Sequence, residues 1–356
     1  MEEKIDILRL NRAQLTTPAY KELIQSLFVK GDVDARLRYA NWAFIENPAL
    51  KPDEDLPIYL CRVDGKDAGQ FAIIPVDIMF AGERIRGGWC VDFYVSPDYQ
   101  RRGIGTKLLN SAFLDFPVLM TLGQTVPSFE LFHHRLKWIY NDNRLTRYKS
   151  FLKKRLAGKY LLAKMGFGKG SPAPIAQSIH GDLPAGVSFE SVDSFEGFPD
   201  FMRGKNLEDE NVTCILRTVP FLTWRYLQHP FITYNLHKIS VSSGQSILVV
   251  WREQVTDCWN ESIIVDILYP GTVSKESMEI ALDAFQKCIY FMGFETIECR
   301  TSDRLVLESF KDNFMSKREP VQKFIYGKKT MEDCPVIEND QWKLYAGDCD
   351  VDTLNF

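Results

Sequence analysis

Two glycines, Gly103 and Gly105, follow Gln100, Arg101 and Arg102 in a short stretch that separates an apolar run from a helix-like run. A glycine-rich loop that opens a helix gathers several backbone N–H groups around one point, and the helix dipole adds positive potential there. A Cβ at either glycine would crowd a phosphate held in this way. The two arginines can add charge to the same anion. The spacing therefore predicts a binding site for the diphosphate of coenzyme A or of a dinucleotide.

The residues around this loop indicate which of the known nucleotide-binding motifs it matches. A Rossmann fingerprint needs G-x-G-x-x-G with an acidic residue about 20 positions on, and a P-loop ends in Gly-Lys-Ser/Thr. Here Gly105 is followed by Thr106 and Lys107, which is the wrong order for a P-loop. The remaining pattern, residues 100–105 preceded by the strand-like residues 91–95 and a Ser-Pro-Asp turn, resembles motif A of the GNAT acyltransferases, Gln/Arg-x-x-Gly-x-Gly/Ala.

The resemblance implies an acyl-CoA site, with acetyl-CoA as the default donor and no metal. The pantetheine chain would follow the backbone of Phe93, Tyr94 and Val95 as if it added a strand. The diphosphate would bind the loop residues Gln100, Arg101, Arg102, Gly103, Ile104, Gly105 and Thr106. Transfer would need no covalent enzyme intermediate, because the acceptor amine attacks the thioester directly while the protein supplies proximity, an oxyanion donor, a base and an acid.

Asp92 lies in the strand-like run before the loop and is a candidate for the base, because the resemblance implies a frequent Asp at this place. Strand alternation argues against this role. The catalytic carboxylates of the family often share the face that carries Trp89 and Val91, and alternation predicts that Asp92 points away from that face. A structural role, in which Asp92 caps a neighbouring element, is the alternative.

His133 is a candidate for the acid that protonates the departing thiolate. The family commonly carries a Tyr for this step in a Leu-Tyr-x-x-x-Gly-Phe pattern, which aligns with residues 132–138. His133 then occupies the Tyr position and Lys137 the Gly position. A histidine can transfer this proton near neutral pH. The alternative is that His133 and His134 are ordinary surface residues of a helix.

Periodicity and turn signals indicate the elements that position these residues. We expect an apolar helical face around residues 23–28, strands at 58–63, 68–78, 85–95 and 118–123, a helix at 100–114 behind the glycine loop, and another at 128–138. Residues 164–188 hold many Gly and Pro residues and are expected to be a linker.

The second half of the chain echoes the first. The spacing of Trp42 and Pro48 returns in Trp224 and Pro230, and a strand ending at Pro270 is followed by a helix-like run at 275–290 and a strand at 296–299. Residues 271–275 contain no Gly-x-Gly. The resemblance to two-domain GNAT proteins of bacterial polysaccharide biosynthesis extends to the Trp-Arg-Tyr segment and to the tail from Trp342 to Asp350.

The expected fold class is therefore α/β (α+β), with tandem GNAT-like domains that each have a mixed, mostly antiparallel central sheet flanked by helices. We expect a GNAT domain with motif A at residues 1–160, a linker at 161–188 and a degenerate GNAT-like domain without the CoA loop at 189–356. Truncation near Gly170 would then leave a first domain that still folds but can aggregate, because the face that meets the second domain is exposed.

Composition limits the other possibilities. The chain has 356 residues, 45% apolar residues and a net charge of −4, which fits a globular protein of two domains without a general attraction to nucleic acid. Its eight cysteines form no C-x-x-C pair, so we expect reduced thiols. The N-terminus does not resemble a signal peptide and no run of 18 apolar residues is present, which favours a cytoplasmic location.

A basic stretch at residues 144–159 lacks acidic side chains. It can contact an anionic membrane surface, but a solvated helical face is the simpler interpretation. The basic residues are Arg144, Arg147, Lys149, Lys153, Lys154, Arg155 and Lys159.

The leading hypothesis is an acetyl-CoA-dependent N-acyltransferase acting on a small-molecule amine or an amino sugar. One alternative is a non-catalytic tandem GNAT protein that binds CoA or a partner protein. Another is an aminoacyl-tRNA-dependent transferase, which the acidic net charge and the intact CoA loop disfavour. The sequence contains no signature of the acceptor.

Overall fold

The computed structural model describes residues 3–27, 32–153, 183–197, 212–256, 259–311, 316–337 and 341–349, together with a few positions between 156 and 165. The strands of the first half are β1 (Ile5–Arg9), β2 (Ile58–Val63), β3 (Lys66–Phe80), β4 (Glu83–Val95), β5 (Val118–Leu122) and β6 (Ile139–Phe151). Those of the second half are β7 (Ser188–Val192), β8 (Thr213–Ile215), β9 (Asn235–Ser240), β10 (Ser246–Val255), β11 (Asn260–Leu268), β12 (Thr296–Thr301), β13 (Lys317–Lys328) and β14 (Trp342–Lys343).

The described helices flank these strands. They are α1 (Pro18–Leu27), α2 (Val33–Ala40), α3 (Ile104–Ala112), α4 (Val126–Phe129), α7 (Val219–Leu222), α8 (Lys275–Phe291) and α9 (Arg304–Ser309). Three π-helical turns, Asn41–Ile45, Glu130–Arg135 and Thr223–Leu227, extend α2, α4 and α7. The strands and the helix expected around motif A are confirmed, with boundaries shifted by a few residues.

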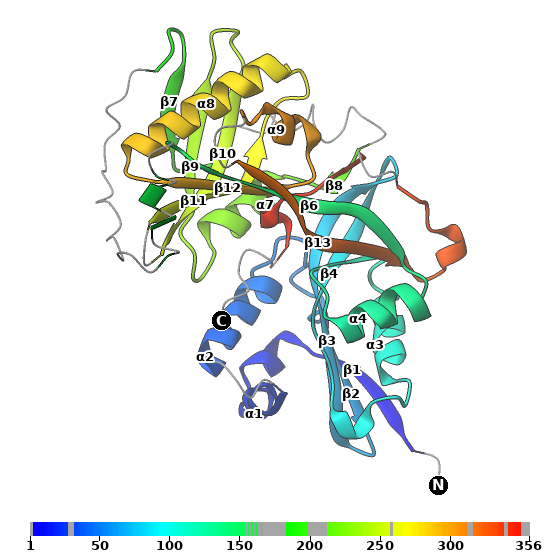
Figure 1. The fold of residues 1–356 in the computed structure, drawn as a ribbon. Helices are drawn as coiled ribbons and strands as arrows, with labels where there is room; N and C mark the ends of the chain where they lie inside the picture. The colour runs from blue at the N-terminus through cyan, green and yellow to red at the C-terminus, as the bar shows by residue number, and fades with distance from the viewer. Residues whose placement is uncertain are drawn as a thin grey trace.

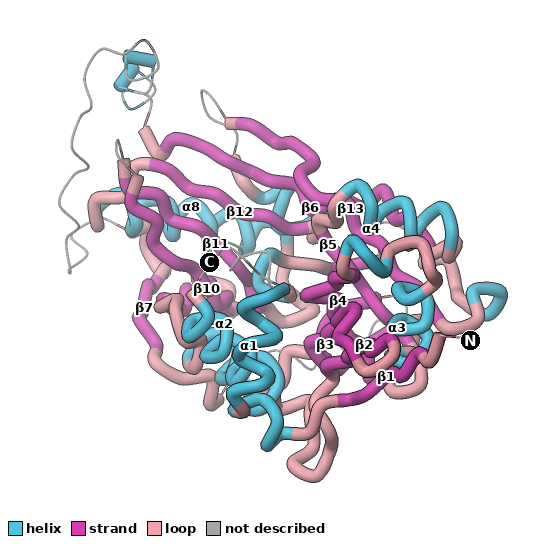
Figure 2. The backbone as a smooth tube through the Cα atoms, turned by 90° about the horizontal axis from the view of Figure 1, so that it is seen from below, coloured by secondary structure: helices cyan, strands magenta, loops and turns pink. Residues whose placement is uncertain are grey.

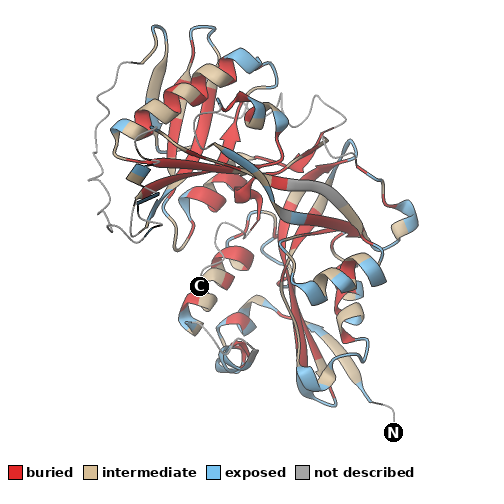
Figure 3. Ribbon diagram, viewed as in Figure 1, coloured by how far each residue is buried: buried red, intermediate tan, exposed pale blue. Residues whose placement is uncertain are grey.

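The first half has helices on both faces of its sheet. Apolar residues of α1 and α2, such as Leu23 and Ile24, pack on one face together with Trp89 and Val91. Helix α3 and the segment α4 with its π-helical turn pack on the other face, where Leu108 belongs to a second core. Figures 1 and 2 show these helices on opposite sides of β2, β3 and β4. Figure 3 shows that the central strands between them are buried.

The second half repeats this order of elements. Strands β10 and β11 form an antiparallel pair, α8 follows, and β12 returns parallel to β11, as β3, β4, α3 and β5 do in the first half. The tandem α/β fold expected from the sequence is confirmed. The two halves do not form two separate sheets. All the described strands belong to one hydrogen-bonded sheet, and its main order is β1-β2-β3-β4-β5-β13-β6-β12-β11-β10-β9-β7.

Trp42 and Trp224, which carry the repeat in the sequence, meet in the structure. Their rings stack with centroids 4.5 Å apart. The indole N–H of Trp42 donates to the carbonyl of Trp224 at 3.0 Å, and the indole N–H of Trp224 donates to the carbonyl of Trp42 at 2.8 Å. A reciprocal contact of this kind is what a two-fold relation between two copies produces. The repeat is therefore visible as a local pseudo-symmetric contact between the halves.

The two halves also exchange strands. Strand β13, from the C-terminal part of the chain, lies between β5 and β6 and pairs with both in antiparallel register. Strand β6 in turn pairs with β12 through Phe151–Thr296 to Thr146–Thr301. The division at residues 160 and 189 stays a prediction, and most of the expected linker lies outside the described residues.

The basic stretch does not form the expected helical face. Residues 144–151 are the C-terminal part of β6, and several basic side chains of the stretch are paired with glutamates of the second half. Arg147 contacts Glu319, Lys149 lies 2.5 Å from Glu261, and Lys159 lies 2.8 Å from Glu295. Lys154 and Arg155 lie outside the described residues. Among the helices that the structure describes, none is long and apolar enough to cross a membrane.

Candidate active site

Strands β4 and β5 separate where motif A begins. They pair in parallel only through Gly87–Val118, Gly88–Leu119 and Trp89–Met120. Strand β4 continues to Val95, whereas the end of β5 pairs on its far side with β13, as in Ile325–Thr121. The edge of β4 that faces β5 is therefore unpaired beyond Trp89. An unpaired strand edge presents a row of N–H and C=O groups to which an extended ligand can bind.

The loop after β4 contains two residues with a left-handed backbone. Arg101 and Gly103 have positive φ values of 64° and 78°, and Gly103 precedes the first residue of α3. Left-handed residues placed in this way form an anion-binding concavity at the start of a helix. Within the described part of the chain, no hydrogen bond is donated by the N–H groups of residues 101–106. The loop thus has the geometry predicted for a diphosphate site.

The two glycines are required for reasons that lie in the protein itself. Gly103 has free space around an added Cβ, but its left-handed backbone disfavours other residues. At Gly105, an added Cβ would lie 3.1 Å from the Phe93 ring. Phe93 belongs to the core on the α3 side of the sheet, so its backbone rather than its ring faces a ligand on the edge of β4.

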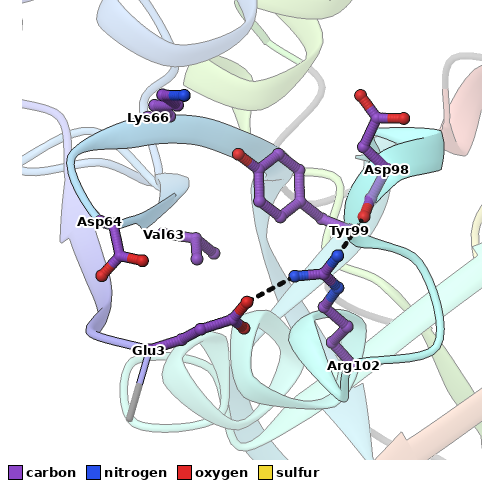
Figure 4. A pocket seen from close by; sticks show the side chains of 7 residues that line it. All are labelled: Glu3, Val63, Asp64, Lys66, Asp98, Tyr99 and Arg102. Carbon is purple, nitrogen blue, oxygen red and sulfur yellow. Dashed lines mark hydrogen bonds and ion pairs between the residues drawn. The ribbon is translucent and has the colours of Figure 1, made fainter. Parts of the chain in front are cut away.

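The other loop residues differ in how their side chains are used. The Gln100 amide donates to the carbonyl of Val95 at 3.0 Å and ties the loop to the end of β4. Arg102 contacts Glu3 at 2.6 Å, donates to the carbonyl of Asp98 at 2.8 Å and lies over the Tyr99 ring. Figure 4 shows Arg102 directed toward Glu3 in a pocket that Lys66 and Asp64 also line.

Arg101 is exposed and makes no described contact. Of the two arginines it has the side chain that is more available to an anion. The predicted contacts of the loop with a cofactor stay predictions.

Asp92 lies on the face of the sheet opposite to the one expected. The register of β3 and β4 shifts between Gln70–Tyr94 and Ala72–Val91, so β4 has a bulge at Asp92 and Phe93. Asp92 has a positive φ of 46° at this bulge. A bulge resets the alternation of side chains. Asp92 therefore lies on the α1–α2 side, with Val91, and the alternation argument against it was wrong.

The carboxylate of Asp92 is within reach of two residues that the sequence did not indicate. Its Oδ1 lies 3.9 Å from a guanidinium nitrogen of Arg36 in α2. Burial raises the pKa of Asp92, and the charge of Arg36 opposes this rise. Asp92 in turn helps burial to raise the pKa of Tyr20 in α1. The Asp92 side chain nevertheless keeps 30% of its surface exposed. Asp92 is therefore a carboxylate that packs against α1 and α2 and stays partly exposed.

His133 lies in the π-helical turn Glu130–Arg135 on the α3 side of the sheet. Its Nδ1 is 3.2 Å from the carbonyl of Trp138, and since a carbonyl only accepts, Nδ1 donates. In the neutral ring Nε2 is then the basic nitrogen. Lys137 has a positive φ of 59°, which explains why a Gly is common at this position of the family pattern. The structure does not bring Asp92 and His133 together, because they lie on opposite faces of the sheet.

The corresponding region of the second half is filled by the chain itself. Strand β12 uses one edge to pair with β6, and Tyr345 of the C-terminal tail bridges to Thr301 on the edge that faces β11. The turn Ala346–Asp348 contacts both β11 and β12. Asp266, the counterpart of Asp92, is fully buried and accepts from Tyr226 at 2.9 Å.

The loop before α8 also lacks the features of motif A. The Ser274 side chain caps the helix by accepting from the N–H of Ser277, and the Gln245 amide donates to the carbonyl of Thr272 at 2.7 Å. None of residues 271–275 has a positive φ.

The structure also describes the thiols and possible metal ligands. Seven cysteines in the described residues are free, and six of them are buried. Among the same residues, no group of three or more His, Cys, Asp or Glu side chains could hold a metal ion.

Comparison with known proteins shows what this part of the chain is similar to. Residues 54–140 match the sequence model of the acetyltransferase (GNAT) domain. No curated protein matches the chain in sequence. Similar solved structures include GCN5-related N-acetyltransferases from Anabaena variabilis, with a TM-score of 0.57 and 14% identity over 91% of this chain and 73% of that chain, and from Kribbella flavida, with 0.56 and 11% over 91% and 72%.

A probable N-acyltransferase from Enterococcus faecalis has a TM-score of 0.55 and 11% identity, over 90% of this chain and 72% of that chain. At such identities the structural likeness establishes the fold. The match to residues 54–140 covers the strands and the loop that form the candidate site. Residues 54–140 are therefore similar to a GNAT acetyltransferase domain, and the fold resembles that of a GCN5-related N-acetyltransferase along 91% of this chain.

Proposed function

We propose that this protein is an acyl-CoA-dependent N-acyltransferase, with acetyl-CoA as its donor and a small amine or an amino sugar as its acceptor. The observation that carries the proposal is the unpaired edge of β4, which leads directly into a loop with free N–H groups at the start of α3. The edge fits an extended pantetheine chain, and the loop fits a diphosphate.

The proposed reaction uses one residue from each face of the sheet. The amine nitrogen attacks the thioester carbon, a C–N bond forms, and the carbonyl oxygen takes the negative charge next to backbone N–H groups of β4. The C–S bond then breaks and releases a thiolate. Asp92 accepts the proton from the amine on the α1–α2 side, and protonated His133 donates a proton to the thiolate on the α3 side. Attack and departure thus take place on opposite sides of the gap between β4 and β5.

The raised pKa of Asp92 suits its role, because a carboxylate that holds a proton more tightly is a better acceptor. The base works only when deprotonated, so the rate should rise with pH through this raised pKa. Asp92→Asn should lower kcat and abolish this rise while the affinity for acetyl-CoA stays unchanged. Asp77→Asn, on β3 beside Arg84, is the matched control and should leave both unchanged.

Isothermal titration calorimetry with acetyl-CoA tests the proposal most directly. We expect one site per chain, because the tail closes the corresponding region of the second half. The absence of binding at millimolar acetyl-CoA would overturn the proposal. Binding without transfer to any amine in a broad panel would favour a CoA-binding protein without turnover, which the histidine at the Tyr position also permits.

A further inference from the structure

Gln70 of β3 is a buried amide without a hydrogen-bond partner. Gln70 is 1% exposed, and neither its side-chain nitrogen nor its side-chain oxygen is paired with a described group. Burying an unpaired amide destabilises a fold, so such groups are uncommon and call for an explanation. A ligand that supplies the missing partners is one explanation.

The register places Gln70 beside the candidate base. Gln70 pairs with Leu60 on one side and with Tyr94 on the other, and residues paired across strands share a face of the sheet. Leu60 belongs to the core under α1 and α2. The bulge that turns Asp92 to this same face lies between Val91 and Tyr94, directly next to the Gln70 pair.

A second unpaired group lies on the other side of Asp92 along β4. The indole N–H of Trp89 has no described partner although the residue is 2% exposed. Trp89 pairs with Ile74, and both belong to the core on the α1–α2 side. Asp92, which keeps 30% of its side chain exposed, lies between Trp89 and Tyr94, the partner of Gln70, along β4.

We infer that Gln70 binds the acceptor and selects amines that carry a hydroxyl group close to the nitrogen, as amino alcohols and amino sugars do. The inference rests on the proposed function. A hydroxyl donates and accepts, and therefore matches both atoms of an amide. The ammonium form of the acceptor pairs with the Asp92 carboxylate and loses one proton to solvent, and Asp92 then accepts the second proton when the neutral amine attacks. A simple alkylamine leaves the Gln70 amide unpaired, and a site that has buried polar groups disfavours such a ligand.

The test compares two acetyl acceptors that differ by one hydroxyl, trans-2-aminocyclohexanol and cyclohexylamine. We expect the wild-type protein to have a kcat/KM at least tenfold higher for the amino alcohol. Gln70→Leu should reduce this ratio to about one, with an unchanged affinity for acetyl-CoA. Gln254→Leu, at an exposed position of β10, is the control and should keep the wild-type ratio. A ratio that Gln70→Leu leaves unchanged would overturn the inference.

Thermal unfolding without ligand gives an independent readout. Removing an unpaired buried amide should raise Tm by roughly 2–4 °C in Gln70→Leu and in Gln70→Met. A fall in Tm in both variants would show that the amide has a structural partner, and would overturn the inference.

A third readout separates this inference from the proposed function. If the wild type acetylates neither amine, or binds no acetyl-CoA, the proposed function fails. The inference is then decided by the Tm shift that each amine produces. A larger shift with the amino alcohol, lost in Gln70→Leu, supports it, and equal shifts contradict it.

Discussion

At the scale of single residues, Gly103 combines a left-handed backbone with free N–H groups around it. Gly103→Asp places a carboxylate in the diphosphate site and disturbs these N–H groups. At about 1.5–3 kcal/mol for each charge-assisted hydrogen bond lost, we expect binding to weaken by roughly 2–4 kcal/mol, or about 30- to 1000-fold. Calorimetry with acetyl-CoA measures this loss.

Gly244 provides a matched control for this substitution. It has a φ of +79°, close to the +78° of Gly103, and an added Cβ would meet nothing within 4 Å at either position. Gly244→Asp should therefore introduce the same backbone strain far from motif A and leave the affinity for acetyl-CoA intact. Equal affinities in the two variants would contradict the placement of the diphosphate.

His133 can be separated from its neighbour by substitution. We expect His133→Ala to lower kcat by roughly 10²- to 10⁴-fold, the usual contribution of a general acid, with little change in CoA affinity. His134→Ala is the control, because its side chain is 54% exposed and lies 3.7 Å from Glu130. Steady-state kinetics with a functional acceptor measures both. A loss of less than about threefold in His133→Ala would return this residue to a surface role.

At the scale of elements, strand β13 connects the two halves. Truncation near Gly170 removes β12 and β13, which leaves one edge of β5 and both edges of β6 unpaired. We therefore expect the fragment 1–170 to aggregate, in contrast to the independent folding that the sequence favours. Co-expression with fragment 171–356 should restore a soluble complex, detected by size-exclusion chromatography. A soluble, cooperatively unfolding 1–170 fragment on its own would contradict this view.

At the scale of the whole molecule, two buried histidines make stability depend on pH. Burial and the charge of Arg225 lower the pKa of His229 to about 3, and burial lowers that of His237 to about 4. Both stay neutral in the folded state, so the stability they confer is full above the unfolded pKa of about 6.5 and is lost as pH falls below it. We expect each to cost about 2 kcal/mol at pH 5.

The raised pKa of Asp348, caused by burial and opposed by Arg217, partly offsets this loss, because its protonation favours the folded state. Urea unfolding at pH 7.5 and pH 5 measures the net change. His237→Asn keeps an acceptor for the indole N–H of Trp251 but cannot titrate, and should reduce the pH dependence. An unchanged dependence in this variant would contradict the assignment.

Local sequence determined the elements that form the candidate site. The strand, loop and helix of motif A follow from short-range patterns, because a left-handed glycine and an amphipathic helix are properties of a few neighbouring residues. The spacing of Trp42 and Trp224 likewise predicted a repeat that the structure shows as a reciprocal contact. The sequence also shows directly that residues 271–275 contain no Gly-x-Gly pair.

The face that Asp92 occupies could not be predicted from β4 alone, because a bulge arises from the register between β3 and β4. The same holds for residues 144–151. Their charges indicated a solvated helix, but in the structure they pair with β12 and β13 as part of the sheet. The insertion of β13 beside β5 and the unpaired amide of Gln70 depend on contacts between segments far apart in the chain. Hydrogen-bond partners across such distances leave no periodic signal in a single sequence, and this is why the positions of these groups emerge only from the folded chain.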